Sequence, residues 1–222
     1  MKKDQLYTDL KRQILTMELA PGSSLDETQL SEQYQISRTP LRDVFRQLAG
    51  EGYLEIVSNR GASVASMDHN TLRNFFMSAP MLYAAIGRLA AENATSEQLQ
   101  AMGAAQAEFK TAAANGDTES LIYWNDRFHA LMGEMAHNPY LMPSYERLLI
   151  DHARISQTFY SSRIQNFDGV LQEAAGHHDE MIICIENADA DGMVELIKSH
   201  WAMSQYQMEI FVRPNPLPVD DY

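Results

Sequence analysis

Residues 37–48 read Ser-Arg-Thr-Pro-Leu-Arg-Asp-Val-Phe-Arg-Gln-Leu, and their pattern predicts a helix with two different faces. Ser37 is a favourable N-cap residue, and a proline in the first turn of a helix removes no hydrogen bond. Arginines follow at four-residue spacing, namely Arg38, Arg42 and Arg46. Because each step of four residues advances only about 40° around a helix, the three guanidinium groups share one face.

The neighbouring arc of this helix is apolar and consists of Leu41, Val44, Phe45 and Leu48. A helix that buries one face and presents guanidinium groups on another suits the major groove of DNA, where arginine forks bind guanine edges and phosphates. Ser37 and Thr39 at the helix start add hydroxyl and backbone N–H donors for phosphate. The alternative is that the arginines only solvate a surface helix and pair with Asp43 and Glu51.

Shorter patterns on either side of this helix complete a small domain. The spacing of apolar residues predicts helices over residues 4–18 and 27–34, separated by a turn. After the arginine-bearing helix, the alternating runs 53–57 and 62–65 indicate a β-hairpin. Three helices and a hairpin describe a winged helix-turn-helix. Arg60-Gly61 at the hairpin tip would place a cation in or beside the minor groove of DNA.

From residue 68 onward the apolar spacing stays helical, which is typical of an all-α bundle. The expected helices span residues 69–93, 96–115, 117–136, 139–162, 168–187 and 189–211. The fold class is therefore mainly α. We expect a winged helix-turn-helix domain at residues 1–67, an all-helical domain at 68–212 and a flexible, proline-rich tail at 213–222.

The charge of the chain is divided unevenly between these two parts. The formal net charge of −13 argues at first sight against binding to phosphates. Residues 1–67, however, contain eight Lys/Arg and nine Asp/Glu, so that almost all of the excess acidity lies in the remainder of the 222-residue chain. The overall charge therefore does not exclude DNA binding by the first domain.

The single cysteine, Cys184, excludes an intrachain disulfide framework and a cysteine-based zinc finger, and it fits a reducing compartment. The N-terminus carries no apolar segment of the kind found in signal peptides, and no run of 18 apolar residues occurs. We expect a cytoplasmic protein without membrane contact.

A group of polar residues in the second part has the spacing of a metal site. Asn125 and His129 lie one helical turn apart, and His178 and His200 lie about equally far from the turn between two successive helices. Three imidazoles and an amide oxygen suit a divalent metal ion such as zinc or nickel. The alternative is that they are ordinary hydrogen-bonded interior histidines. We expect the other histidines at the surface or in loops; they are His69, His137, His152 and His177.

Residues 6–66 resemble the N-terminal domain of GntR-type bacterial transcription regulators. The resemblance rests mainly on Ser-Arg-Thr-Pro-x-Arg at residues 37–42 and on the Arg-Gly of the wing. It implies a homodimer on a short palindromic operator. It also implies operator contacts by Arg38, Thr39, Arg42, Arg60 and Gly61. For Arg46 a phosphate contact and a salt bridge remain equally open.

Residues 69–210 resemble the FCD class of these regulators, named after the FadR C-terminal domain, through the stretches 88–95, 125–129, 138–141 and 199–200. The resemblance implies an effector-binding and dimerisation domain in which Asn125, His129, His178 and His200 hold the metal ion. Asn125 supplies a neutral oxygen, so we expect weaker metal binding than with an aspartate. Asp126 is the alternative fourth ligand.

The effectors of this class are small carboxylates and sugar acids, bound over the metal inside the bundle. Two charged positions common in the class fall on Ser78 or Ala79 and on Tyr83 here. We expect Tyr83 to line the effector pocket, and Arg154 or Arg163 to supply the missing cation. Pro80 should kink the helix that carries Tyr83.

These observations predict a ligand-responsive, sequence-specific DNA-binding transcription regulator, a repressor rather than an enzyme. Its partners are operator DNA and a small organic acid. The alternatives are a metal-dependent hydrolase-like activity in the bundle and a DNA binder that responds to no ligand.

Overall fold

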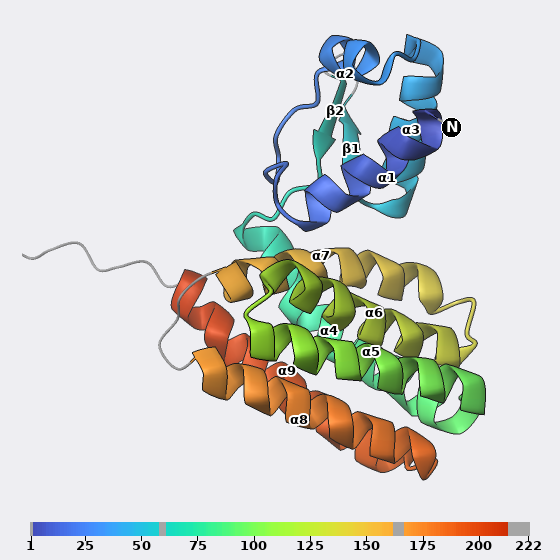
Figure 1. The fold of residues 1–222 in the computed structure, drawn as a ribbon, viewed down its shortest axis with the longest axis vertical. Coiled ribbons are helices and arrows are strands. Elements are labelled where there is room, and N and C mark those ends of the chain that lie inside the picture. Colours follow the sequence, from blue (N-terminus) through green and yellow to red (C-terminus); the bar gives the residue numbers. More distant parts are fainter. Residues whose placement is uncertain (1, 58–60, 162–166, 213–222) are drawn as a thin grey trace, which may run out of the picture.

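The computed structural model describes residues 2–57, 61–161 and 167–212, and Figure 1 shows a small winged helix-turn-helix set against a helical bundle. The elements of the winged helix are α1 (Lys2–Leu15), α2 (Glu27–Tyr34), α3 (Arg38–Glu51), β1 (Leu54–Val57) and β2 (Gly61–Val64). Those of the bundle are α4 (His69–Asn93), α5 (Ser96–Asn115), α6 (Thr118–Ala136), α7 (Met142–Ser161), α8 (Phe167–Glu186) and α9 (Ala190–Val212). The expected architecture is confirmed.

The winged helix has its own apolar core, built from the faces that the helical spacing predicted. Its fully buried side chains are Leu6, Leu10 and Ile14 of α1, Leu41, Val44 and Leu48 of α3, and Val64 of β2. Strands β1 and β2 pair antiparallel with Leu54 opposite Val64. Helix α3 continues through Gly50 and stops at Gly52, whose φ of +96° favours glycine.

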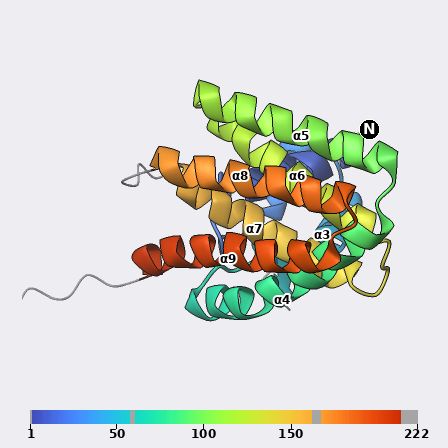
Figure 2. The same ribbon diagram turned by 90° about the horizontal axis from the view of Figure 1, so that it is seen from below.

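The bundle begins and turns at residues suited to helix ends. Asp68 accepts a hydrogen bond from the Thr71 N–H at the start of α4, and Thr95 forms a capping box with Gln98 at the start of α5. Helix α4 packs on α6, α7 and α9 and remains one helix through Pro80. Figure 2 shows α8 lying between α5 and α9. Within the described residues, no helix is both long and apolar enough to span a bilayer.

Helix α7 of the bundle lies against the winged helix, as Figure 1 shows. Ile150 is 4% exposed and belongs to the apolar core of the winged helix rather than to that of the bundle. At the end of α3, a Cβ added to Gly52 would overlap the Arg147 side chain. The two parts of the chain are therefore joined by direct packing as well as by the short segment between β2 and α4.

Candidate nucleic-acid interface and metal centre

Helix α3 presents its polar residues at the surface of the winged helix. Ser37, Arg38, Thr39, Arg42 and Arg46 are all exposed. Ser37 occupies the N-cap position, but its side chain makes no capping hydrogen bond. The hydroxyl and the first backbone N–H groups of α3 therefore remain able to bind a phosphate.

Two of the three arginines form ion pairs, but only one of the pairs is the one that the sequence suggested. Arg46 Nη1 lies 2.9 Å from Asp43 Oδ1, whereas Arg42 Nη2 lies 3.0 Å from Glu27 Oε2. Arg38 has no ion-pair partner within the part of the chain that the structure describes.

The expected partner Glu51 instead accepts a hydrogen bond from the Tyr7 hydroxyl, which belongs to α1. Glu51 therefore joins α3 to α1, and the ion pairs of Arg42 and Arg46 are made with other residues.

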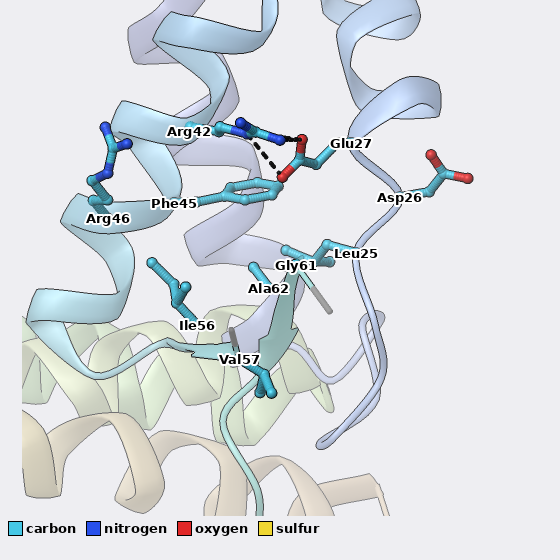
Figure 3. Close-up of a pocket in the computed structure, with 10 residues that line it drawn as sticks. All are labelled: Leu25, Asp26, Glu27, Arg42, Phe45, Arg46, Ile56, Val57, Gly61 and Ala62. Carbon is cyan, nitrogen blue, oxygen red and sulfur yellow. Dashed lines mark hydrogen bonds and ion pairs between the residues drawn. The ribbon is translucent and has the colours of Figure 1, made fainter. Parts of the chain in front are cut away.

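The wing and α3 enclose a groove of about 630 Å³. Figure 3 shows Arg42, Glu27 and Phe45 above it, with Ile56 and Val57 of β1 below. Gly61 at the start of β2 has a φ of +81°, and an added Cβ would meet no atom of the described residues within 4 Å. The backbone of Gly61 can therefore approach a ligand closely. Arg60, the cation expected at the wing tip, lies outside the described residues.

Three histidines from three helices meet inside the bundle. His129 of α6, His178 of α8 and His200 of α9 are at most 5% exposed, and one ring nitrogen from each lies within 4.8 Å of the others. Nitrogens that share a tetrahedral zinc ion lie about 3.3 Å apart, so small side-chain shifts would close the set around an ion. Asn125 is buried one turn before His129 on α6. His178 and His200 thus lie side by side, as their equal distances from the turn between α8 and α9 predicted.

Burial keeps these imidazoles neutral. It holds the pKa of His129 and of His178 well below the ordinary value and lowers the pKa of His200 to about 3; neighbouring histidines act in the same direction. Neutral imidazole is the form that binds a metal ion.

Gln106 of α5 determines which nitrogen of His178 carries the proton. The amide nitrogen of Gln106 donates to Ala175 O at 2.9 Å and to Asp179 Oδ1 at 3.0 Å. Its oxygen, 3.1 Å from His178 Nδ1, can only accept, so Nδ1 is the donor. The lone pair of His178 therefore lies on Nε2, a buried atom with no hydrogen-bond partner among the described residues. A partner on the distal nitrogen is the usual support of a metal-binding histidine.

His152 was expected at the surface or in a loop, but it is buried on α7 beside the three histidines. Its ring centroid lies 4.7 Å from that of His129. Its Nδ1 lies 2.8 Å from the hydroxyl of Tyr83, which is 1% exposed. Burial lowers the pKa of His152 to about 4. Sequence reasoning missed His152 because α7 carries no motif that marks it; only the apolar spacing of the helix could have indicated its inward face.

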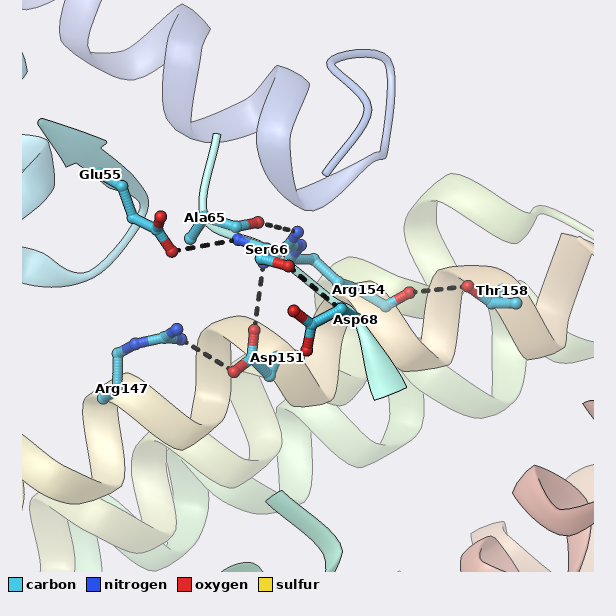
Figure 4. Close-up of polar contacts among 8 residues, drawn as sticks. All are labelled: Glu55, Ala65, Ser66, Asp68, Arg147, Asp151, Arg154 and Thr158. Carbon is cyan, nitrogen blue, oxygen red and sulfur yellow. Dashed lines mark hydrogen bonds and ion pairs between the residues drawn. The ribbon is translucent and has the colours of Figure 1, made fainter. Parts of the chain in front are cut away.

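The predicted pocket residues lie in different places. Tyr83 packs against His129, with ring centroids 5.6 Å apart. Arg154, by contrast, lies at the segment that joins the two parts, where its Nη2 donates to Ala65 O at 2.6 Å and its Nη1 to Asp151 Oδ1 at 3.1 Å, as Figure 4 shows. Arg163 lies outside the described residues.

Asp126, the alternative fourth ligand, does not belong to the histidine group. It lines a hollow between the winged helix and the bundle together with Lys11 and Tyr53. Burial raises its pKa to about 6, although the positive charges of Lys11 and Arg127 act in the opposite direction. Asp126 therefore faces the winged helix.

Both parts of the chain match models of known families. Residues 2–64 match the model for bacterial regulatory proteins of the gntR family, and residues 81–203 match that for the FCD domain.

The chain is also similar to individual relatives. It is 29% identical over 167 residues to the uncharacterised HTH-type transcriptional regulator YdhC of Bacillus subtilis (strain 168), covering 74% of this chain and 71% of that protein. It is 27% identical to the galactonate operon transcriptional repressor of Escherichia coli (strain K12), covering 86% and 89%. It is 24% identical to the transcriptional repressor RspR of the same organism, covering 88% and 84%.

Among solved structures, McbR/YncC of E. coli superposes with a TM-score of 0.76 at 21% identity, covering 95% of this chain and 96% of that one. At this level of identity the likeness shows the fold alone.

Proposed function

Because the chain belongs to the gntR family of bacterial regulatory proteins and carries an FCD domain, it is a DNA-binding transcription regulator and not an enzyme; we propose that it is a metal-dependent, ligand-responsive repressor. Two of its relatives are named repressors, which supports repression here. We further propose that a homodimer places one α3 in the major groove of each half of a palindromic operator. Ser37, Arg38, Thr39, Arg42, Arg46, Arg60 and Gly61 are the proposed operator contacts.

The proposal of a metal centre rests on one observation, namely buried imidazole nitrogens left without protein partners. Both ring nitrogens of His129 and Nε2 of His178 have no hydrogen-bond partner within the described part of the chain. A buried polar atom without a partner is costly, and a metal ion would satisfy the lone pairs on the two rings. His129, His178, His200 and Asn125 are the proposed ligands, and the donor set suits zinc or nickel.

The charge of this donor set supports an organic acid as the effector. Three neutral imidazoles and an amide oxygen leave the double positive charge of a divalent ion uncompensated, so an anion at an open coordination position is favoured. Trp201, adjacent to His200, adds a buried indole N–H with no hydrogen-bond partner among the residues described. That N–H can donate to a carboxylate.

Helix α7 offers a route by which ligand binding reaches the winged helix. His152 contacts the histidine group, whereas Ile150 on another face of the same helix packs in the core of the winged helix and Arg154 donates to the Ala65 carbonyl. A shift of α7 would move both sets of contacts together. We infer that the effector shifts the population between two positions of the winged helices, only one of which fits both operator half-sites.

The first experiment is metal analysis of tag-free protein. We expect close to one metal ion per chain, lost in His178→Ala and retained in His69→Ala, a control that removes an exposed histidine from the start of α4. Metal absent from the wild type, or equal amounts in the two variants, would contradict the metal centre.

Operator affinity with and without chelator separates a responsive regulator from one that binds DNA regardless of ligand. Affinity that changes with neither chelator nor added organic acids would support the second.

A further inference from the structure

The carboxylate of Glu27 holds the guanidinium of Arg42 on one edge. Arg42 Nε lies 3.0 Å from Oε2 and 3.2 Å from Oε1, and Nη2 lies 3.0 Å from Oε2. Figure 3 shows the two side chains meeting above the ring of Phe45, at the upper edge of the groove between α3 and the wing. The Nε and Nη2 edge of Arg42 is thus already paired before any DNA binds.

Glu27 itself is held in place by the backbone around it. It is the first residue of α2, whose N-cap Asp26 accepts hydrogen bonds from the Thr28 and Gln29 N–H groups. Two residues before Glu27, Leu25 N donates to Ala62 O of β2 at 2.9 Å. The Glu27 side chain is only 22% exposed, and a carboxylate at a helix N-terminus is electrostatically favoured. The ion pair therefore connects α3 to α2 and, through Leu25, to the wing.

We propose that Glu27 is a positioning residue for base recognition by Arg42, an inference that rests on operator binding by α3. A guanidinium group has its N–H donors in a fixed planar fork. With Nε and one side of Nη2 bound to Glu27, the donors that remain are those of Nη1 and the outer side of Nη2. These donors point along the side chain, in the arrangement that binds O6 and N7 of one guanine. Glu27 thus restricts Arg42 to end-on, bidentate contact.

The second ion pair of α3 has a different character. Arg46 and Asp43 lie one turn apart on the same helix, with side chains 67% and 45% exposed. Such an exposed pair on one helix is weak and restricts the arginine little. Arg42 is thus positioned by a residue of another helix, α2, which is itself connected to the wing. The partner of Arg46 lies on the same helix as Arg46 and cannot position it in this way.

Glu27 also has a second effect on DNA binding, namely electrostatic repulsion, which lowers the affinity for DNA instead of improving recognition. A carboxylate close to DNA repels phosphate, so its removal should raise affinity for every sequence alike. Positioning, by contrast, affects only the ratio between the affinity for the preferred sequence and that for other sequences. The two effects can therefore be separated by measuring both affinities.

The experiment uses full-length protein and two duplexes. One is the consensus that the wild type selects from a random-sequence pool, and the other is a scrambled duplex of equal composition. Glu27→Ala should lower the ratio of the two affinities about tenfold, the order expected for one bidentate base contact. Glu27→Gln, which keeps the shape and one acceptor oxygen, should lower it less. Glu32→Ala removes an exposed carboxylate from the same helix and should change the ratio less than about threefold.

Combination with Arg42→Ala tests whether Glu27 acts through Arg42. In protein that already carries Arg42→Ala, Glu27→Ala should not change the ratio of the two affinities further. In addition, the DNA sequences selected by each single variant should lose their preference at the same base pair. An equal rise in affinity for both duplexes, or a loss of ratio that persists without Arg42, would overturn the proposal. Glu27→Gln provides the same test if Glu27→Ala does not fold. A wild type that selects no sequence would overturn operator recognition as well.

Discussion

His152 and His200 lie in an interior that lowers the pKa of His152 to about 4 and that of His200 to about 3, mainly through burial. Unfolded histidine protonates near pH 6.5, so below about 6.5 the unfolded chain binds more protons than the folded chain. Above that pH both states of chelator-treated protein leave these histidines neutral, so the histidines do not lower its free energy of unfolding. The protein should lose about 1.4 kcal/mol per pH unit for each histidine as the pH falls toward the folded pKa values.

Urea unfolding of chelator-treated protein at about pH 7, 6 and 5 measures this loss. His152→Gln removes one of the groups and should give a shallower decline. An equal slope in the variant and the wild type would show that His152 is already protonated in the folded protein or takes no part in the linkage.

At the scale of the element, two glycines distinguish a tight helix contact from an open one. A Cβ added to Gly87 of α4 would overlap Ile197 of α9, whereas one added to Gly103 of α5 would meet no atom within 4 Å in the described part of the chain. Gly87→Ala should therefore destabilise by about 1–3 kcal/mol through overpacking. Gly103→Ala should stabilise by about 0.5–1 kcal/mol, because alanine is the better helix former. Thermal unfolding of both variants tests the contrast, and a loss in both would contradict it.

Helix α7 carries two ion pairs beside its contacts with the winged helix, and both pairs lie within the helix itself. Arg154 is fully buried and pairs with Asp151, which is itself 5% exposed. Arg154→Met leaves that carboxylate with only the exposed Arg147, so we expect a loss of about 3 kcal/mol or more in the free energy of unfolding. Arg147→Met, which removes a partner that is 38% exposed, should cost about 1 kcal/mol or less.

The same pair of variants tests the route of coupling. If α7 transmits ligand binding, Arg154→Met should reduce the change in operator affinity caused by chelator, while Arg147→Met keeps most of it. Unchanged coupling in Arg154→Met would place the route elsewhere, for example along the segment between β2 and α4.

At the scale of the whole molecule, we expect two chains on each operator. Light scattering of the complex should add about 50 kDa to the mass of the duplex, twice the 25.1 kDa of one chain. A duplex with a single half-site should bind at least about a hundredfold more weakly, because the second contact is no longer intramolecular. One chain per palindromic duplex would contradict the proposed homodimer.

The arrangement of the elements follows closely from the sequence, because each part carries its own signals. The expected 69–93 and 96–115 helices agree with α4 and α5, whose ends are marked by Asp68, Thr95 and Gly116. The His178 and His200 juxtaposition was also predictable, since a turn between antiparallel helices relates the two positions. Contacts between elements distant in the sequence were not, because helical spacing shows which face is apolar but not which neighbour covers it. The placement of His152 and Arg154 and the pairing of Arg42 with Glu27 belong to this class.

The core of the winged helix contains Ile150, a residue contributed by α7, so the winged helix of this chain is not a self-contained part. If the winged helix were cut at residue 67 and fused to the bundle of another protein, the apolar surface that Ile150 covers would be exposed. The Ala65 carbonyl would also lose the guanidinium group of Arg154. A working chimera would need the matching side chains of α7 transplanted with the winged helix. Substitutions on the exposed face of α3 would leave the contacts of Ile150 and Ala65 unchanged, whereas replacement of the winged helix as a unit would remove them.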